Sequence, residues 1–165
     1  EYYAAMKYVN KKDLNWWSLK NISKDIKLTH WSYFENWDPY RNYIYAKKYF
    51  NYQEKEKKNI GTYTNFSQND TYLYDLHCYL MFLKYGFGRG TQDIGIDIRR
   101  GSLSRNQGVE LAKIYDTEPA FEHLEMYLEY FKINKKQFFK TIDKFTNKKL
   151  FKKTKGVWTP KFKIQ

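Results

Sequence analysis

The sequence is short of cysteine, proline and long apolar runs, and each shortage excludes a class of protein. The single cysteine among 165 residues, Cys78, cannot form an internal disulfide, so a disulfide-stabilised scaffold is excluded and a reducing compartment is favoured. No apolar run approaches the roughly 20 residues that a transmembrane helix needs, and no signal peptide is recognisable. We therefore expect a cytoplasmic protein that has no contact with a membrane core.

Acids and arginine are nearly absent from the C-terminal end. Residues 132–165 contain 12 lysines, no arginine and one acid, Asp143, so they carry +11 of the net charge of +12. Such a segment suits contact with a polyanion or a membrane surface. It is also what an A/T-rich genome produces, because lysine, asparagine and isoleucine are abundant throughout. The lack of arginine argues against bidentate phosphate recognition.

What the chain does contain is typical of a helical protein. Its length suits one domain, and 42% apolar residues are enough to bury a core. The apolar side chains mostly recur at helical spacing, as in the stripe of Phe121, Leu124 and Leu128. We expect a mainly α fold: a single helical domain of about six helices, with an irregular aromatic-rich N-terminal segment and a short extended C-terminal tail.

Capping residues mark where the helices begin. Asp38-Pro39 and Glu118-Pro119 each place an acid before a proline that suits the first helical position. Ser104-Arg-Asn-Gln107 and Asn134-Lys-Lys-Gln137 match the capping box, and Thr91 is a further candidate cap. These signals predict helices over residues 39–50, 71–85, 91–100, 104–115, 118–131 and 134–145.

Three glycines at every second position, Gly86, Gly88 and Gly90, surround Arg89 between two of these helices. The pattern superficially resembles a dinucleotide-binding loop, but that fingerprint follows a strand, whereas a helix precedes it here. We interpret the glycines as a tight hinge, with the N-terminus of the following helix facing an anionic partner.

Polar side chains gather around the hinge. His77 and Lys84 are seven residues apart and share one helical face, while Asp93, Asp97 and Arg100 share another. A salt-bridge network that locks two helices together and a pocket for a polar, anionic ligand both explain this pattern, and spacing alone leaves them open.

Other chemistry is less well supported. A metal site is not expected, because His77 and Cys78 are adjacent and point about 100° apart on a helix. The aromatic segment 29–40 suits stacking on a sugar or base, or else anchoring in the core. The loop 61–70, which includes Asn65, offers hydroxyls and amides either to a ligand or to the helix that follows.

Several motifs together point to a known family. They are His30-Trp-Ser-Tyr-Phe-Glu-Asn-Trp-Asp-Pro-Tyr, Gly61-Thr-Tyr-Thr-Asn-Phe, Leu76-His-Cys-Tyr-Leu-Met-Phe-Leu-Lys-Tyr-Gly-Phe-Gly-Arg, and Asp97-Ile-Arg-Arg-Gly with Arg105. In this combination the chain resembles the N-acetyl sugar amidotransferases, which act in bacterial lipopolysaccharide biosynthesis and in flagellin glycosylation through pseudaminic-type acids.

The resemblance covers nearly the whole chain but only the C-terminal part of a family member. The family's N-terminal PP-loop ATP pyrophosphatase domain, with its Ser-Gly-Gly-x-Asp-Ser phosphate loop, has no counterpart in the sequence, and the first residue is Glu1. We therefore expect residues 1–165 to be the helical C-terminal domain of a larger enzyme, inactive alone.

The resemblance implies a reaction in which ATP activates a sugar acetamido group and ammonia converts it to an acetamidino group. It implies ATP with Mg²⁺ as cofactor, bound mainly by the N-terminal domain. The implied partners are an anionic N-acetylated sugar and a glutaminase that delivers ammonia, with neither a membrane nor nucleic acid among them.

The resemblance also implies roles for the residues around the hinge. His77 is the candidate for proton transfer, and Lys84 and Arg89 for contact with a phosphate or carboxylate, so these three are the implied catalytic residues. The implied substrate-binding residues are Asp93, Asp97, Arg99, Arg100, Arg105 and Asn65.

Two alternatives remain: a basic helical module that binds nucleic acid through its tail, and a purely structural interaction domain. Salt separates the first of these from the enzyme, because a nucleic-acid binder loses affinity steeply as salt rises.

Overall fold

The computed structural model describes residues 25–165. The chain divides into two compact units, one ending at Asn36 and one spanning Trp37–Gln165. The described part of the first unit holds a short 3-10 helix, η2 (Trp31–Tyr33), where the Trp31 indole Nε1 donates a hydrogen bond to Glu35 Oε2 at 3.0 Å. The rest of the aromatic-rich N-terminal segment lies outside the described residues.

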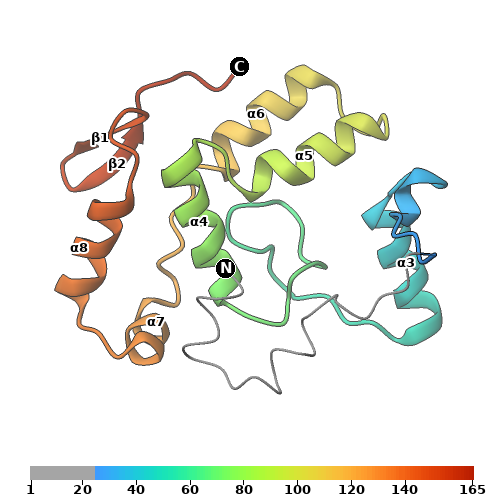
Figure 1. Cartoon of the computed structure of the whole chain (residues 1–165), viewed down its shortest axis with the longest axis horizontal. Coiled ribbons are helices and arrows are strands. Elements are labelled where there is room, and N and C mark those ends of the chain that lie inside the picture. The colour runs from blue at the N-terminus through green and yellow to red at the C-terminus, as the bar shows by residue number, and fades with distance from the viewer. Residues whose placement is uncertain (1–24) are drawn as a thin grey trace. The chain divides into compact units, whose positions relative to one another are not determined.

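The second unit is built of helices and one β-hairpin (Figure 1). Its helices are α3 (Pro39–Phe50), α4 (Leu73–Tyr85), α5 (Arg89–Arg99), α6 (Arg105–Tyr115), α7 (Leu124–Phe131) and α8 (Lys135–Phe145). The predicted mainly α fold is therefore confirmed. Side chains of Asp38, Ser104 and Asn134 cap α3, α6 and α8, as their sequence signals predict.

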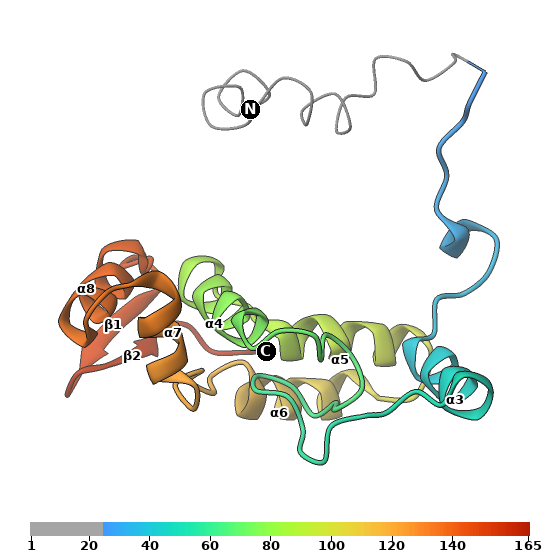
Figure 2. The ribbon, with the colours of Figure 1, turned by 90° about the horizontal axis from the view of Figure 1, so that it is seen from below.

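The core surrounds α4, which lies between the α5–α6 pair and the α8–hairpin side in both ribbon views (Figures 1 and 2). Phe82 and Leu83 of α4 are almost fully buried, and they belong to one cluster with Tyr127 of α7 and Phe138 of α8. The Phe82 ring meets the ring of Phe151 edge to face, with centroids 5.1 Å apart. One continuous core thus fixes α4 in place.

The α5–α6 pair packs through a glycine. A Cβ atom on Gly108 of α6 would lie 2.7 Å from Ile94 Cγ2 and 2.8 Å from Ile98 Cδ1 of α5. Because only a residue without Cβ permits this approach, Gly108 sets how closely α6 supports the helix that carries the polar residues.

The basic C-terminal segment is largely folded. After α8, strands β1 (Phe151–Thr154) and β2 (Val157–Pro160) pair antiparallel around a turn at Lys155 and Gly156, both with positive φ. Lys153 Nζ lies 2.6 Å from Asp143 Oδ2, the single acid of this segment. The predicted extended tail is part of this hairpin, but strand β1 was not predicted, because one apolar residue followed by two lysines gives no strand pattern.

Three helix starts differ from prediction. Helix α4 begins at Leu73 and not at Thr71. Helix α7 begins at Leu124 and not at Pro119, since Glu118 is used elsewhere: its Oε2 accepts a hydrogen bond from Gly61 N at 2.9 Å. Helix α5 begins at Arg89 and not after Thr91, because its cap comes from a residue far along the chain.

Candidate functional site

The hinge between α4 and α5 is closed by an internal carboxylate. Helix α4 is capped at its C-terminus by Gly86 with φ 87°, and α5 begins three residues later, at Arg89. The buried Asp116 accepts hydrogen bonds from Gly88 N at 3.0 Å, Thr91 N at 2.9 Å and Thr91 Oγ1 at 2.5 Å. The anion that we expected at this helix N-terminus is therefore a side chain of the chain itself.

This arrangement also tests whether the hinge fits a nucleotide phosphate. Phosphate sites at helix N-termini depend on free backbone N–H groups. At this hinge Asp116 already uses the N–H groups of Gly88 and Thr91. The hinge does not fit a phosphate, and no step of a reaction is assigned to ATP at this position.

We expect Asp116→Asn to lower the free energy of unfolding by about 2 kcal/mol. The substitution removes the negative charge that accepts hydrogen bonds at the buried N-terminus of α5. The new amide NH₂ group is itself a donor, and it cannot accept from the N–H groups of Gly88 and Thr91. Urea unfolding followed by circular dichroism measures the loss. Ser104→Ala, which removes an exposed cap on α6, serves as the control and should cost about 1 kcal/mol. Equal losses for the two variants would contradict the special role of Asp116.

Arg89 is buried beneath the site. Its side chain is 2% exposed, and its Nη2 donates to Ser67 O at 2.7 Å and to Ser67 Oγ at 2.9 Å. Its Nε lies 3.6 Å from Asp93 Oδ2, and its Nη1 lies 3.9 Å from Asp75 Oδ1. This guanidinium is almost fully buried, and the expected direct contact between Arg89 and a ligand stays a prediction.

A cavity of about 390 Å³ lies above it, between α3, α5 and the loop that precedes α4. One wall is aromatic: the rings of Tyr43 and Phe66 stack with centroids 4.5 Å apart, and Tyr40 meets Phe66 edge to face at 6.1 Å. The complete lining is Pro39, Tyr40, Tyr43, Tyr63, Thr64, Asn65, Phe66, Ser67, Asp93, Asp97 and Arg100.

Another part of the lining carries charges that are paired, and it adjoins the aromatic wall, because Arg100 Cζ lies 5.5 Å from the centroid of the Tyr40 ring. Arg100 Nε donates to Asp97 Oδ1 at 2.8 Å, and Arg100 Nη1 donates to both oxygens of Asp38 at 2.9 and 3.0 Å. The Tyr63 hydroxyl donates to Asp97 Oδ2 at 2.6 Å. Burial and this contact with Asp97 raise the pKa of Tyr63, so Tyr63 stays a neutral donor. Asp97 has no oxygen left without a partner.

Asp93 sits in a different environment. The Thr62 hydroxyl donates to its Oδ2 at 2.6 Å, and its side chain is 23% exposed. Burial raises the pKa of Asp93 above its ordinary value, although the hydrogen bond from Thr62 and the charge of Arg89 oppose this shift. The two carboxylates of α5 that line the cavity are therefore not equivalent.

The structure brings together part of the predicted site. Asn65, Asp93, Asp97 and Arg100 all line the one cavity. Arg99 and Arg105 are exposed outside it, and Arg105 Nη2 donates to Gln165 O at 3.2 Å. Their predicted binding roles stay predictions.

The three residues predicted to be catalytic are not grouped. His77 is exposed on α4, with its ring centroid 6.1 Å from that of Tyr74, and Arg89 is buried. Lys84 lines a separate apolar groove of about 560 Å³ between α4 and α8. None of the three side chains lines the described cavity, so no single ligand bound there contacts all of them.

Sequence reasoning missed Tyr43 and Asp38 as parts of the site, whereas Tyr63 lies in a loop that it had considered. Helical spacing places Tyr40 and Tyr43 on one face of α3, and the polar loop 61–70 was a candidate for ligand contacts. No pattern, however, links α3 to α5, which meet through residues 62 positions apart, Asp38 and Arg100.

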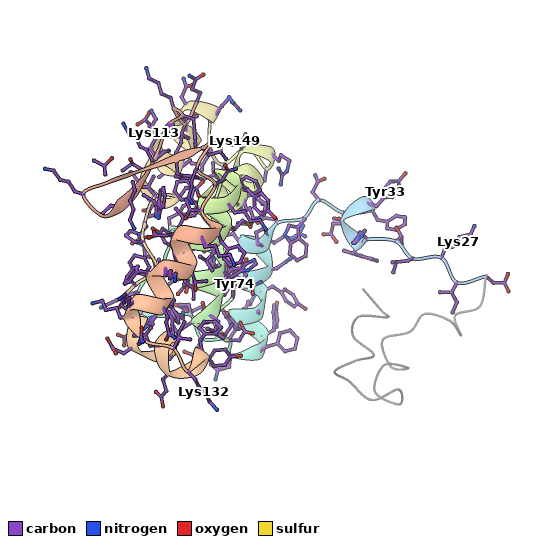
Figure 3. All side chains as sticks on the ribbon, turned by 60° about the vertical axis from the view of Figure 1, so that its left-hand side comes forward. Lys27, Tyr33, Tyr74, Lys113, Lys132 and Lys149 are labelled. Atoms are coloured by element: carbon purple, nitrogen blue, oxygen red, sulfur yellow. The ribbon has the colours of Figure 1, made fainter. Side chains whose placement is uncertain are left out.

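Within residues 25–165, no helix is long and apolar enough to cross a membrane. In the same part of the chain, no group of three or more His, Cys, Asp or Glu side chains is arranged to hold a metal ion. Lysines of the surface, such as Lys113 and Lys132, extend away from the ribbon (Figure 3).

Comparison with known proteins adds a family to this geometry. A family model described as "LPS biosynthesis protein WbpG-like, C-terminal domain" matches residues 60–163. The matched part contains α4 to α8, the hairpin and the cavity residues from Tyr63 to Arg100, whereas α3 precedes it. Among curated proteins, no match is found.

Proposed function

Since this chain belongs to the family of WbpG-like LPS biosynthesis proteins, of which it carries the C-terminal domain, we propose that it is the substrate-binding part of an ATP-dependent N-acetyl sugar amidotransferase. The proposed reaction converts a sugar acetamido group to an acetamidino group during surface glycan synthesis. The observation that carries the proposal is the cavity with one aromatic wall and one wall of carboxylates and hydroxyls.

This cavity matches the two-sided chemistry of a sugar ring. A pyranose has a C–H face that packs on aromatic rings, here Tyr43 and Phe66, and a hydroxyl edge that donates hydrogen bonds. Asp93, which lines the cavity and has only its Oδ2 occupied by Thr62, supplies an acceptor for such a donor. The volume of about 390 Å³ lies within the range of roughly 300–1,000 Å³ usual for small-molecule sites.

The charged side chains in and beside the cavity indicate which part of the substrate binds there. Arg100 is already paired with Asp38 and Asp97, and Arg89 is buried beside Asp75 and Asp93. No free cation lines the cavity among the described residues, so it suits the neutral N-acetylated ring. The carboxylate or diphosphate of an anionic substrate would extend away from the cavity.

In the complete enzyme, ATP with Mg²⁺ supplies the activation of the acetamido oxygen, and we propose that it binds outside residues 25–165. A glutaminase partner would supply ammonia. The acetamido oxygen would bond to the α-phosphorus of ATP, and pyrophosphate would leave. Ammonia would then form the C–N bond as the C–O bond breaks, and the oxygen would leave as part of AMP. The role of this chain is to bind and orient the sugar and to exclude water around its acetamido group.

The proposal predicts that N-acetylglucosamine, used as a probe, binds at the aromatic wall. In a titration followed by NMR, amide signals of Tyr63 and Asn65 should shift with saturation. Tyr43→Ala should raise the dissociation constant about tenfold, because the stacking surface is lost.

Tyr45→Ala is the matched control, since Tyr45 is an exposed tyrosine of the same helix that does not line the cavity. It should leave binding unchanged. Absence of saturable shifts around the cavity, or equal affinity in Tyr43→Ala and wild type, would refute the proposed function.

A further inference from the structure

Among the described residues, one carboxylate oxygen of the cavity lining accepts no hydrogen bond. Both oxygens of Asp97 accept hydrogen bonds, from Arg100 and Tyr63, and both oxygens of the neighbouring Asp38 accept from Arg100. In Asp93, Thr62 occupies Oδ2, and no donor of the described residues reaches Oδ1 within hydrogen-bond distance. Asp93 is thus the carboxylate of this cavity with an acceptor to offer a ligand.

We propose that Asp93 binds the nitrogen that the reaction introduces, by pairing its free oxygen with the amidinium cation of the acetamidino product. This inference rests on the proposed function and deepens it by assigning a catalytic residue. It is more specific than the role implied by the family resemblance, in which Asp93 is one of several substrate-binding residues.

The chemistry of the conversion requires such a partner. The acetamido group is neutral, whereas an amidine is a strong base that carries a proton at neutral pH, so one positive charge appears as the C–N bond replaces the C–O bond. A fixed carboxylate stabilises that charge more than it stabilises the neutral amide, which is the condition for accelerating the step. Amidinium N–H groups and carboxylate oxygens form strong, charge-assisted hydrogen bonds.

The negative charge of Asp93 is only partly compensated by its neighbours, which favours binding of a cation. The distance of 3.6 Å from Arg89 Nε to Asp93 Oδ2 is too long for a good hydrogen bond, so Arg89 compensates the carboxylate only in part. Burial raises the pKa of Asp93, as expected for a carboxylate whose charge lacks full compensation. An N–H donor of a ligand would satisfy the Asp93 oxygen that no donor of the described residues reaches.

Titration with acetamidinium chloride tests the proposal on this chain without ATP or ammonia. We expect saturable NMR shifts for Thr62, Asp93 and Asn65, and none for acetamide, which has the same shape but no charge. Asp93→Asn, an isosteric change, should weaken acetamidinium binding at least about tenfold. Asp70→Asn, an exposed carboxylate of the preceding loop, should not. Because the chain carries +12, general attraction of a cation is disfavoured.

The outcomes separate this inference from the proposed function. If N-acetylglucosamine binds but acetamidinium and acetamide behave alike, the assignment of Asp93 is wrong and the sugar site stands. If tetramethylammonium binds as well as acetamidinium, the cavity recognises only charge, and the assignment is equally wrong. If N-acetylglucosamine does not bind, the proposed function fails. The comparison of acetamidinium with acetamide needs no variant, so it holds even if Asp93→Asn does not fold.

Discussion

Arg89→Ala is expected to destabilise the protein by about 3–5 kcal/mol, the cost typical of removing one partner from a buried charged network. The substitution would leave Asp75, 3% exposed, and Asp93 without their shared cation. It would also remove the two hydrogen bonds that hold Ser67 against α5. Urea unfolding monitored by circular dichroism gives the change in the free energy of unfolding.

Arg99→Ala is the matched control, because Arg99 is exposed and lies on the same helix. Its effect should stay within about 0.5 kcal/mol. Arg89→Lys should recover only part of the loss, since lysine keeps the charge but cannot reproduce the guanidinium fork toward Ser67. An Arg89→Ala protein with wild-type stability would show that Arg89 is free to act on a ligand, as the sequence suggested.

Much of the fold is predictable because its signals are local. The capping boxes at Ser104 and Asn134 lie within four residues of the helices they start, and both helices begin where expected. The start of α5 was not predictable, because its cap, Asp116, comes from the end of α6. The helix start predicted at Glu118-Pro119 was wrong for a related reason. Glu118 accepts a long-range hydrogen bond from Gly61 N and does not cap a helix.

The candidate site likewise has features that local sequence spacing predicts and features that depend on long-range contacts. Helical spacing places Asp93, Asp97 and Arg100 on one face, and all three line the cavity. Spacing also left open whether these charges bind a ligand or each other, and the answer depends on Asp38 and Tyr63, whose contacts with them no sequence pattern indicates. The family resemblance is confirmed at the level of LPS biosynthesis, while the amidotransferase reaction and its residues stay proposals.

The steric role of the hinge glycine Gly90 can be tested by replacing it with alanine and measuring whether the free energy of unfolding falls or rises. A Cβ on Gly90 would lie 2.8 Å from Asp116 Oδ1, and 3.1 Å from both Gly61 O and Tyr115 Cβ. Asp116 Oδ1 is held by the hydrogen bond from Thr91 N, and Gly61 O belongs to the backbone, so neither atom can easily move away. We expect Gly90→Ala to lower the free energy of unfolding by about 3 kcal/mol, the upper end for overpacking, because it also displaces the cap of α5.

Gly95→Ala provides the opposite result within the same helix. The nearest atom to a Cβ there is Arg99 Nη1 at 3.4 Å, the end of a flexible side chain. Replacing a glycine in a helix interior by alanine should therefore stabilise the protein by up to about 1 kcal/mol. Two Gly→Ala changes five residues apart thus have opposite expected signs in one unfolding experiment. If both stabilised the protein, intrinsic helix propensity would dominate, and Gly90 would have no steric role in seating α5 against Asp116.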